Sequence, residues 1–198
     1  MDYLVYFSIT IILIVGIYQF YFWTQNNMFR KAKEFKTTQI DDWFKLKPGW
    51  VYVYSGLYYP VIVFLIYVVE DMRQFNYMAI SFFMLMLMQM VFFILVPVVT
   101  PEHWRNLPES KSLSVRFLGL VQRFDQRSNC FPSMHVSVAT LTALHLTLNA
   151  PYLAPWAWLF PILIALSALY TKQHYFYDLA PGAVLGWIAF KGFQWMWF

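Results

Sequence analysis

Charged side chains are scarce in this sequence. Asp, Glu, Lys and Arg make up 12% of the 198 residues, whereas 60% are hydrophobic and 22% are aromatic. A water-soluble globule of this composition would lack the polar surface needed to cover itself. The composition therefore excludes an ordinary soluble domain and indicates a chain that folds in a lipid bilayer.

Cysteines, linkers and repeats are also missing. With Cys130 as the only cysteine, an internal disulfide is excluded, and we interpret this residue as a packing residue. No repeat, Gly/Ser-rich linker or low-complexity tract interrupts the chain, so we expect one domain over 1–198. The N-terminal apolar segment has no basic start and no small-residue cleavage site after it, which predicts a retained helix rather than a cleaved signal.

Long runs without charge are what the sequence does contain. A hydrocarbon core of about 30 Å needs about 20 apolar residues per helix, and 3–29, 48–69 and 74–101 each lack Asp, Glu, Lys and Arg. The run 128–171 is too long for one span, and the turn-forming residues 149–151 divide it. A sixth helix begins near Asp178. The prediction is an all-α bundle of six transmembrane helices at about 3–23, 49–70, 77–100, 133–149, 154–171 and 178–197.

Six spans place the connections 24–48, 101–128 and 172–178 on one face of the membrane and both termini on the other. The first face carries 12 of the 14 Lys and Arg residues. The positive-inside rule would make that face cytoplasmic, but an anionic substrate also selects basic residues near its site. On this face, segment 29–47 is either a short helix along the headgroups or a solvated linker, and its net positive charge favours anionic lipid.

Residues 129–135 form the first of two clusters that put ionisable groups beside the membrane, where such groups are costly and usually functional. Pro132 disfavours helix at the residue before it and Ser133 is a suitable N-cap, so His135 is expected in the first turn of a helix. A helix start presents unpaired N–H groups that favour an anion such as phosphate. The cluster predicts either a phosphate site or a plain helix start whose histidine faces the headgroups.

Residues 171–178 form the second cluster. His174 and Asp178 are four residues apart and share one face if the sixth helix begins here. Asp178 would then accept a hydrogen bond from one imidazole nitrogen and leave the other free to attack, while Lys172 adds a positive charge. A structural hydrogen bond or half of a metal site would explain the pair equally well.

Together the two clusters resemble motifs of the type 2 phosphatidic acid phosphatase superfamily of membrane lipid phosphatases and phosphotransferases. That family has a motif of Pro-Ser-Gly-His type and a later Ser-Arg-x5-His-x3-Asp motif. Ser133 and His135 match the first motif; Ser167, His174 and Asp178 match the second. The resemblance covers roughly the C-terminal half of the chain.

The sequence departs from the family pattern in its small and basic residues. Met134 stands where Gly is usual, and Ala168 stands where Arg is expected after Ser167. Lys172 is therefore our candidate for the missing phosphate-binding charge, although an ammonium lacks the planar fork of a guanidinium.

A basic Lys-x6-Arg-Pro motif, which the family carries upstream, is absent here. Arg105 is its nearest equivalent, with Arg123 and Arg127 as alternatives. His103 is interpreted as a bystander, and His145 as a hydrogen-bonded packing residue within a span.

The resemblance implies a mechanism that needs no metal and no cofactor. His174 would attack phosphorus to give a phosphohistidine, and His135 would protonate the departing lipid oxygen. Lys172, Arg105 and the amides around Ser133 and Met134 would hold the phosphate. We expect hydrolysis of phosphatidic acid, a phosphatidylglycerol phosphate or a polyprenyl diphosphate.

Three alternatives stay open at this point. The first is a phosphotransferase resembling inositol phosphorylceramide synthases, and the second is a non-catalytic lipid-binding protein. The third is a metal-dependent hydrolase with His103, His135, His174 and Asp178 as ligands. The expected partners are the bilayer and a lipid phosphate, not nucleic acid. The expected location is a cell membrane such as the bacterial inner membrane, with the site on the extracytoplasmic face that the family usually uses.

Overall fold

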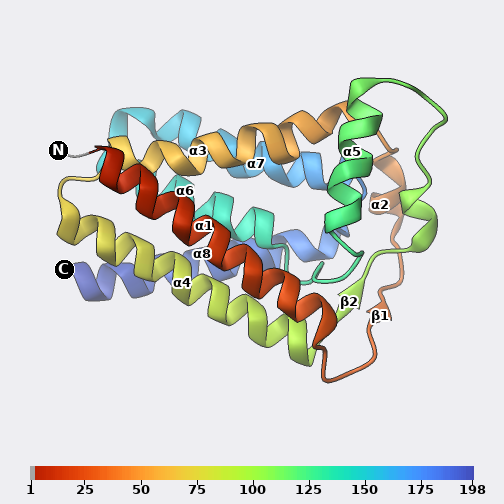
Figure 1. Cartoon of the computed structure of the whole chain (residues 1–198), viewed down its shortest axis with the longest axis horizontal. Coiled ribbons are helices and arrows are strands. Elements are labelled where there is room, and N and C mark those ends of the chain that lie inside the picture. Colours follow the sequence, from red (N-terminus) through yellow and green to blue (C-terminus); the bar gives the residue numbers. More distant parts are fainter. Residues whose placement is uncertain (1–2) are drawn as a thin grey trace.

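The computed structural model describes residues 3–198 and is almost entirely helical (Figure 1). The α-helices are α1 Tyr3–Asn26, α2 Gln39–Trp43, α3 Tyr58–Phe64, α4 Met72–Leu95, α5 Leu113–Phe124, α6 Met134–Asn149, α7 Ala154–Tyr170 and α8 Phe176–Trp197. Short 3₁₀ turns occupy Pro48–Trp50, Leu65–Tyr67, Glu102–Arg105 and Pro151–Leu153, and a π-helical turn occupies Tyr52–Leu57. Two strands, β1 Lys33–Glu34 and β2 Val98–Val99, pair in parallel. The all-α prediction is confirmed apart from this strand pair.

Four helical segments between residues 3 and 198 are long and apolar enough to cross a membrane: α1, Pro48–Tyr67, α4 and Pro151–Tyr170. The remaining two of the six predicted spans are α6, which has 16 residues, and α8, which has 22 residues but is less apolar. The structure therefore supports a membrane protein. Most of α6 is buried by other helices, whereas α8 exposes several large apolar side chains, among them Val184 and Trp187.

Helix α6 forms the centre of the bundle. It packs against α7, α8, α4 and α3, and most of its residues are buried. Two glycines allow α8 to approach it closely, since a Cβ at Gly182 would lie 2.5 Å from the Ser133 carbonyl oxygen and one at Gly186 would meet the Ser137 carbonyl. Small residues four apart on a helix commonly permit such contact between membrane helices. The close α6–α8 contact brings the two histidine clusters together.

Three predicted helix boundaries need correction. The helix expected at 77–100 occupies Met72–Leu95, because the Asp71 side chain caps it by accepting from the Gln74 amide and the chain leaves the helix at Val96. The span expected at 49–70 is irregular rather than one α-helix, with the π-helical turn before α3. The last helix begins at Phe176, two residues before the expected start.

The chain between the bundle helices contains structure that the sequence patterns did not predict. Helix α5 lies within the connection 101–128, with the Ser112 side chain as its N-cap and Leu118 fully buried. Segment 29–47 contains the short α2, and its strand β1 belongs to neither of the two expected forms. In Figure 1 these elements lie at one end of the molecule and both termini lie at the other.

Candidate active site

His174 lies in the connection between α7 and α8 and is 4% exposed. Its Nδ1 is 2.8 Å from the Cys130 carbonyl oxygen and 3.3 Å from Asp178 Oδ2. A carbonyl oxygen only accepts hydrogen bonds, so Nδ1 must carry the proton and Nε2 must carry the lone pair in the neutral ring. This tautomer is the one that a nucleophilic histidine requires.

Asp178 is fully buried and has two tasks. Its Oδ2 accepts from His174 Nδ1 and, at 2.8 Å, from the Tyr175 amide at the start of α8. The predicted hydrogen bond from His174 to Asp178 is confirmed, but the two residues do not share a helix face, because His174 precedes the helix. The contact instead arises from a cap, in which Asp178 folds back over the first turn.

His135 is the second residue of α6 and reaches the same region. Its Nδ1 lies 3.0 Å from the Tyr54 hydroxyl, and the Tyr54 ring stacks on the imidazole with centroids 4.1 Å apart. The His135 and His174 rings are 6.2 Å apart between centroids. No hydrogen bond within residues 3–198 involves Nε2 of either histidine. Each ring is therefore held through Nδ1 and keeps Nε2 available.

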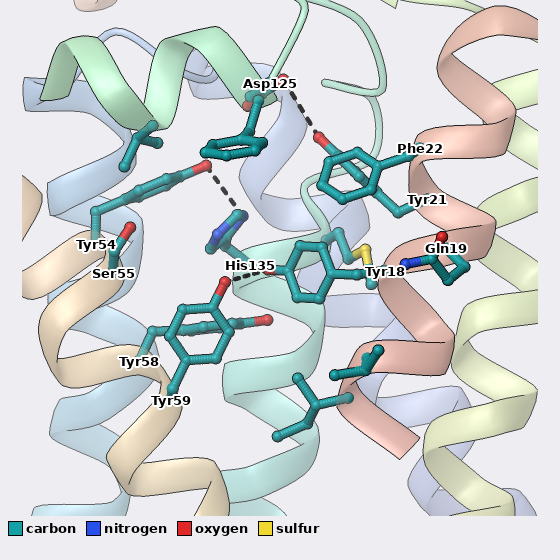
Figure 2. Close-up of a pocket in the computed structure, with 15 residues that line it drawn as sticks. Tyr18, Gln19, Tyr21, Phe22, Tyr54, Ser55, Tyr58, Tyr59, Asp125 and His135 are labelled. Atoms are coloured by element: carbon teal, nitrogen blue, oxygen red, sulfur yellow. Dashed lines mark hydrogen bonds between the residues drawn. The ribbon is translucent and has the colours of Figure 1, made fainter. Parts of the chain in front are cut away.

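A cavity of about 450 Å³ opens onto His135 (Figure 2). Its walls come from α1, the π-helical turn, α3, the end of α5 and the first residues of α6. Figure 2 shows the Tyr18, Tyr54, Tyr58 and Tyr59 rings gathered around the His135 imidazole. Phosphate chemistry at His135 would therefore take place at one end of a largely apolar chamber.

The chain was compared with known protein families, curated proteins and solved structures. The family model described as PAP2 superfamily matches residues 35–192, a range that contains both histidines, Asp178 and most of the bundle. The chain belongs to the PAP2 superfamily. Searches of curated proteins and of solved structures found no match. Membership indicates an enzyme with phosphatase- or phosphotransferase-type activity.

The amides predicted to bind phosphate in this PAP2 protein are only partly free. The Ser133 amide donates to the Asp178 carbonyl at 3.0 Å, and the Ser133 side chain accepts from Val136 as the N-cap of α6. The amides of Met134 and His135 have no hydrogen-bond partner among residues 3–198. These two N–H groups, at the positive end of the α6 dipole, are the ones suited to an anion.

Arg105 is the basic residue that contacts the cavity wall. Its Nη1 donates to the Gln122 carbonyl at 2.7 Å and to the Asp125 carbonyl, and its Nη2 lies 3.8 Å from the Asp125 carboxylate. Its Nε is buried without a partner within residues 3–198, and no hydrogen bond of Nη2 is formed there, so the guanidinium is not fully satisfied by the protein. Burial lowers the pKa of Arg105 from its usual value, while the nearby Asp125 opposes that shift.

The other candidate cations have different partners. Lys172 donates from Nζ to the Asp41 carbonyl at 2.6 Å and lies over the Trp104 ring, so its ammonium ties α2 to the α7–α8 connection. Arg127 pairs with Glu34 at 2.7 Å. Arg123 is exposed. A phosphate role for Lys172 stays a prediction, and Arg105 has the more suitable surroundings.

Asp125 is a site residue that the sequence analysis missed. It follows α5 directly, lines the cavity beside His135 and accepts a hydrogen bond from the Tyr21 hydroxyl at 3.3 Å. Burial raises the pKa of this carboxyl, although Arg105 and His174 act in the opposite direction. Asp125 belongs to none of the motifs found in the sequence. It could have been found only by predicting helix α5, because Asp125 directly follows the end of that helix.

The remaining histidines lie apart from the pair. His145 is fully buried and shares a hydrogen bond of 3.0 Å with the Ser81 hydroxyl, as expected for a packing residue in a span, and His103 is exposed. Within residues 3–198, no group of three or more His, Cys, Asp or Glu side chains is placed to hold a metal ion. The four ligands of the metal-site alternative are therefore not assembled.

Proposed function

We propose that this protein hydrolyses a lipid phosphate through a phosphohistidine formed on His174. The observation that carries the proposal is the pair of imidazoles, 6.2 Å apart, each held at Nδ1 and open at Nε2. Membership of the PAP2 superfamily supports the same class of reaction. The two rings come from separate parts of the chain, and one phosphoryl group lying between them can contact both.

The proposed reaction has two halves. Nε2 of His174 attacks phosphorus, the bond from phosphorus to the lipid oxygen breaks, and His135 gives a proton to that oxygen. Water then attacks the phosphohistidine, gives a proton to His135 and releases inorganic phosphate, which restores His174. Negative charge on the transferred group is stabilised by Arg105 and by the amides of Met134 and His135.

The substrate is proposed to be a lipid because the chamber beside His135 is walled mostly by apolar and aromatic side chains, many of them on α1 and Pro48–Tyr67, which are long and apolar enough to cross a membrane. Phosphatidic acid, a phosphatidylglycerol phosphate and a polyprenyl diphosphate all have the required combination of phosphate and hydrocarbon chain. Phosphatidic acid is the natural first probe.

We further propose six spans, with α6 crossing at the centre and α8 packed against α6 and α4, in a cell membrane such as the bacterial inner membrane. The site end of the bundle, opposite both termini in Figure 1, would face the extracytoplasmic side. Ser110 is exposed at that end, and the native Cys130 is buried. In intact cells, an impermeant thiol reagent should label Ser110→Cys; labelling only after permeabilisation would place the site in the cytoplasm.

The catalytic test compares two histidine-to-alanine variants in detergent. His174→Ala is expected to reduce phosphate release from phosphatidic acid by at least about 1,000-fold, as for removal of other enzymic nucleophiles. His103→Ala removes an exposed histidine and should match the wild type. Full activity of His174→Ala would end the nucleophile assignment.

Three further outcomes separate the alternative functions. Loss of wild-type activity on chelation by EDTA would favour the metal-dependent alternative. Transfer of the phosphoryl group to an added alcohol without release of inorganic phosphate would indicate a phosphotransferase. Binding of lipid phosphates with no turnover of any of them would indicate a non-catalytic protein.

A further inference from the structure

Three neighbouring cavities run from His135 along the inner side of α1. The first is the 450 Å³ chamber of the candidate site, and two smaller cavities of about 50 Å³ and 80 Å³ follow it. They share walls: Ile14 lines all three, Tyr18 and Tyr59 line the first and second, and Ile17 and Ile62 line the second and third. The shared residues make the three cavities one interrupted groove.

The residues that line the groove follow one another along α1 and along the segment that faces it. On α1 the lining runs from Phe22 near His135 to Thr10 at the far cavity, and on the facing segment it runs from Tyr54 to Ile66. At 1.5 Å of rise per residue, Phe22 and Thr10 are separated by about 18 Å along the axis of α1. The groove therefore extends from the phosphate site deep into the apolar part of the bundle.

The chemistry of the walls changes along this path. The upper chamber has tyrosine hydroxyls, Ser55 and the Asp125 carboxylate, whereas the lowest cavity is walled by Ile, Leu, Phe, Met and Ala side chains, with Thr10 as its one hydroxyl-bearing residue. Apolar walls at membrane depth favour hydrocarbon over water. Helix α1 closes one side, and none of its four buried residues, Tyr6, Tyr21, Thr24 and Gln25, lines the middle or the lowest cavity.

A hydrogen bond crosses the groove at its first constriction. The Tyr18 hydroxyl on α1 and the Tyr59 hydroxyl on α3 are 2.6 Å apart, and both residues line the upper and middle cavities (Figure 2). This pair is the only direct side-chain hydrogen bond between α1 and α3 among residues 3–198. It separates the chamber that holds the phosphate chemistry from the apolar part below.

We propose that this groove binds a hydrocarbon chain of the lipid phosphate substrate, with the Tyr18–Tyr59 pair marking the boundary between headgroup and chain. The proposal rests on the proposed function for the identity of the headgroup. It adds the path of the chain, which lies between α1 and the core and ends near Thr10 and Phe75. Chain length should accordingly matter to binding.

Two adjacent residues of α1 give a matched test. Leu13 lines the lowest cavity, about 14 Å along the axis from Phe22, whereas Ile12 is 68% exposed and lines none of the three cavities. The substitution Leu13→Trp should fill the lowest cavity, and Ile12→Trp should place the same ring in the surrounding lipid. Leu13→Phe serves as a smaller blocking variant should the tryptophan prevent folding.

The readout is the ratio of kcat/KM for dipalmitoyl over dioctanoyl phosphatidic acid in mixed micelles. Leu13→Trp should lower this ratio about tenfold, since excluding even two methylenes from an apolar site has that effect. Ile12→Trp should leave the ratio at the wild-type value. Equal ratios in all variants, or an equal loss with both substrates, would overturn the chain path.

A second measurement does not depend on turnover. Phosphatidic acid with a photoreactive diazirine near the end of one chain should crosslink in the wild type to cavity-lining residues of α1 such as Ile14 and Ile17, identified residue by residue in the labelled peptide, and much less in Leu13→Trp. Crosslinking confined to exposed positions such as Ile12 would overturn the proposal even if the enzyme is active. Crosslinking as expected without any turnover would instead refute only the proposed function.

Discussion

The hydroxyl of Tyr54 offers the sharpest test of how His135 is used. It is the hydrogen-bond partner of His135 Nδ1, at 3.0 Å, and the Tyr54 side chain is almost fully buried. A hydroxyl can donate to the neutral imidazole and can rotate to accept from the imidazolium, so it serves both protonation states. The Tyr54→Phe substitution would keep the stacked ring and remove only this partner.

The size of the effect follows from the charge on the ring when it acts as an acid. A hydrogen bond to a charged group contributes about 1.5–3 kcal/mol, which corresponds to a loss of roughly 10- to 150-fold in rate. The loss should fall on formation of the phosphohistidine from a lipid phosphate, because a lipid alkoxide needs a proton to leave. With p-nitrophenyl phosphate, whose leaving group needs no proton, the same step should change by less than about threefold.

Rapid-quench single-turnover measurements of phosphoenzyme formation would supply both rates. Tyr52→Phe is the control, since Tyr52 lies in the same π-helical turn, is half-exposed and does not line the cavity. An equal fall with both substrates would show that Tyr54 only maintains structure. An unchanged lipid rate would refute the acid role inferred for His135.

Two further predictions concern packing and charge. A methyl group at Gly182 would lie 2.5 Å from the Ser133 carbonyl oxygen, so Gly182→Ala should lower the free energy of unfolding by roughly 1–3 kcal/mol and reduce activity, as measured by thermal denaturation and phosphate release. The control Gly16→Ala, with nothing within 4 Å of its Cβ, should change neither stability nor activity. Equal behaviour of the two variants would refute the close contact between α6 and α8. Burial raises the pKa of Asp125, so its carboxylate offsets the Arg105 charge above that pKa and is neutral below it. Inhibition by inorganic phosphate should therefore weaken in the wild type as pH rises through that pKa, and less so in Asp125→Asn; identical pH profiles would exclude the coupling.

The sequence predicted most of the architecture because lipid leaves few choices for a backbone. A run of about 20 apolar residues has to be helical to satisfy its own N–H and C=O groups, and runs without charge located α1 and α4. The same argument failed for α5 and for the π-helical turn, since both depend on neighbouring helices. Helix α5 is too short and too polar to register as a span, and its buried Leu118 needs the bundle to be recognised.

The sequence predicted that His135 lies at a helix start and that His174 contacts Asp178, because each of these features is local and depends on residues only a few positions apart. The basic residues were harder to assign. Lys172 is close to His174 in sequence, yet its ammonium reaches the Asp41 carbonyl, while Arg105 meets Asp125 across 20 residues. Short-range patterns specify which side chains begin a helix, whereas the partner of a long flexible cation depends on everything packed around it.

Composition and spacing thus indicated that this chain is a helical membrane protein, and two short motifs indicated its resemblance to the PAP2 superfamily. The tertiary structure determined the distances between residues that are far apart in the sequence. The close approach of α8 to α6 at Gly182 brings the rings to 6.2 Å, the Cys130 carbonyl selects the tautomer of His174, and α1 encloses a groove below the site. Each of these depends on atoms far apart in the chain, and only packing in three dimensions determines their distance.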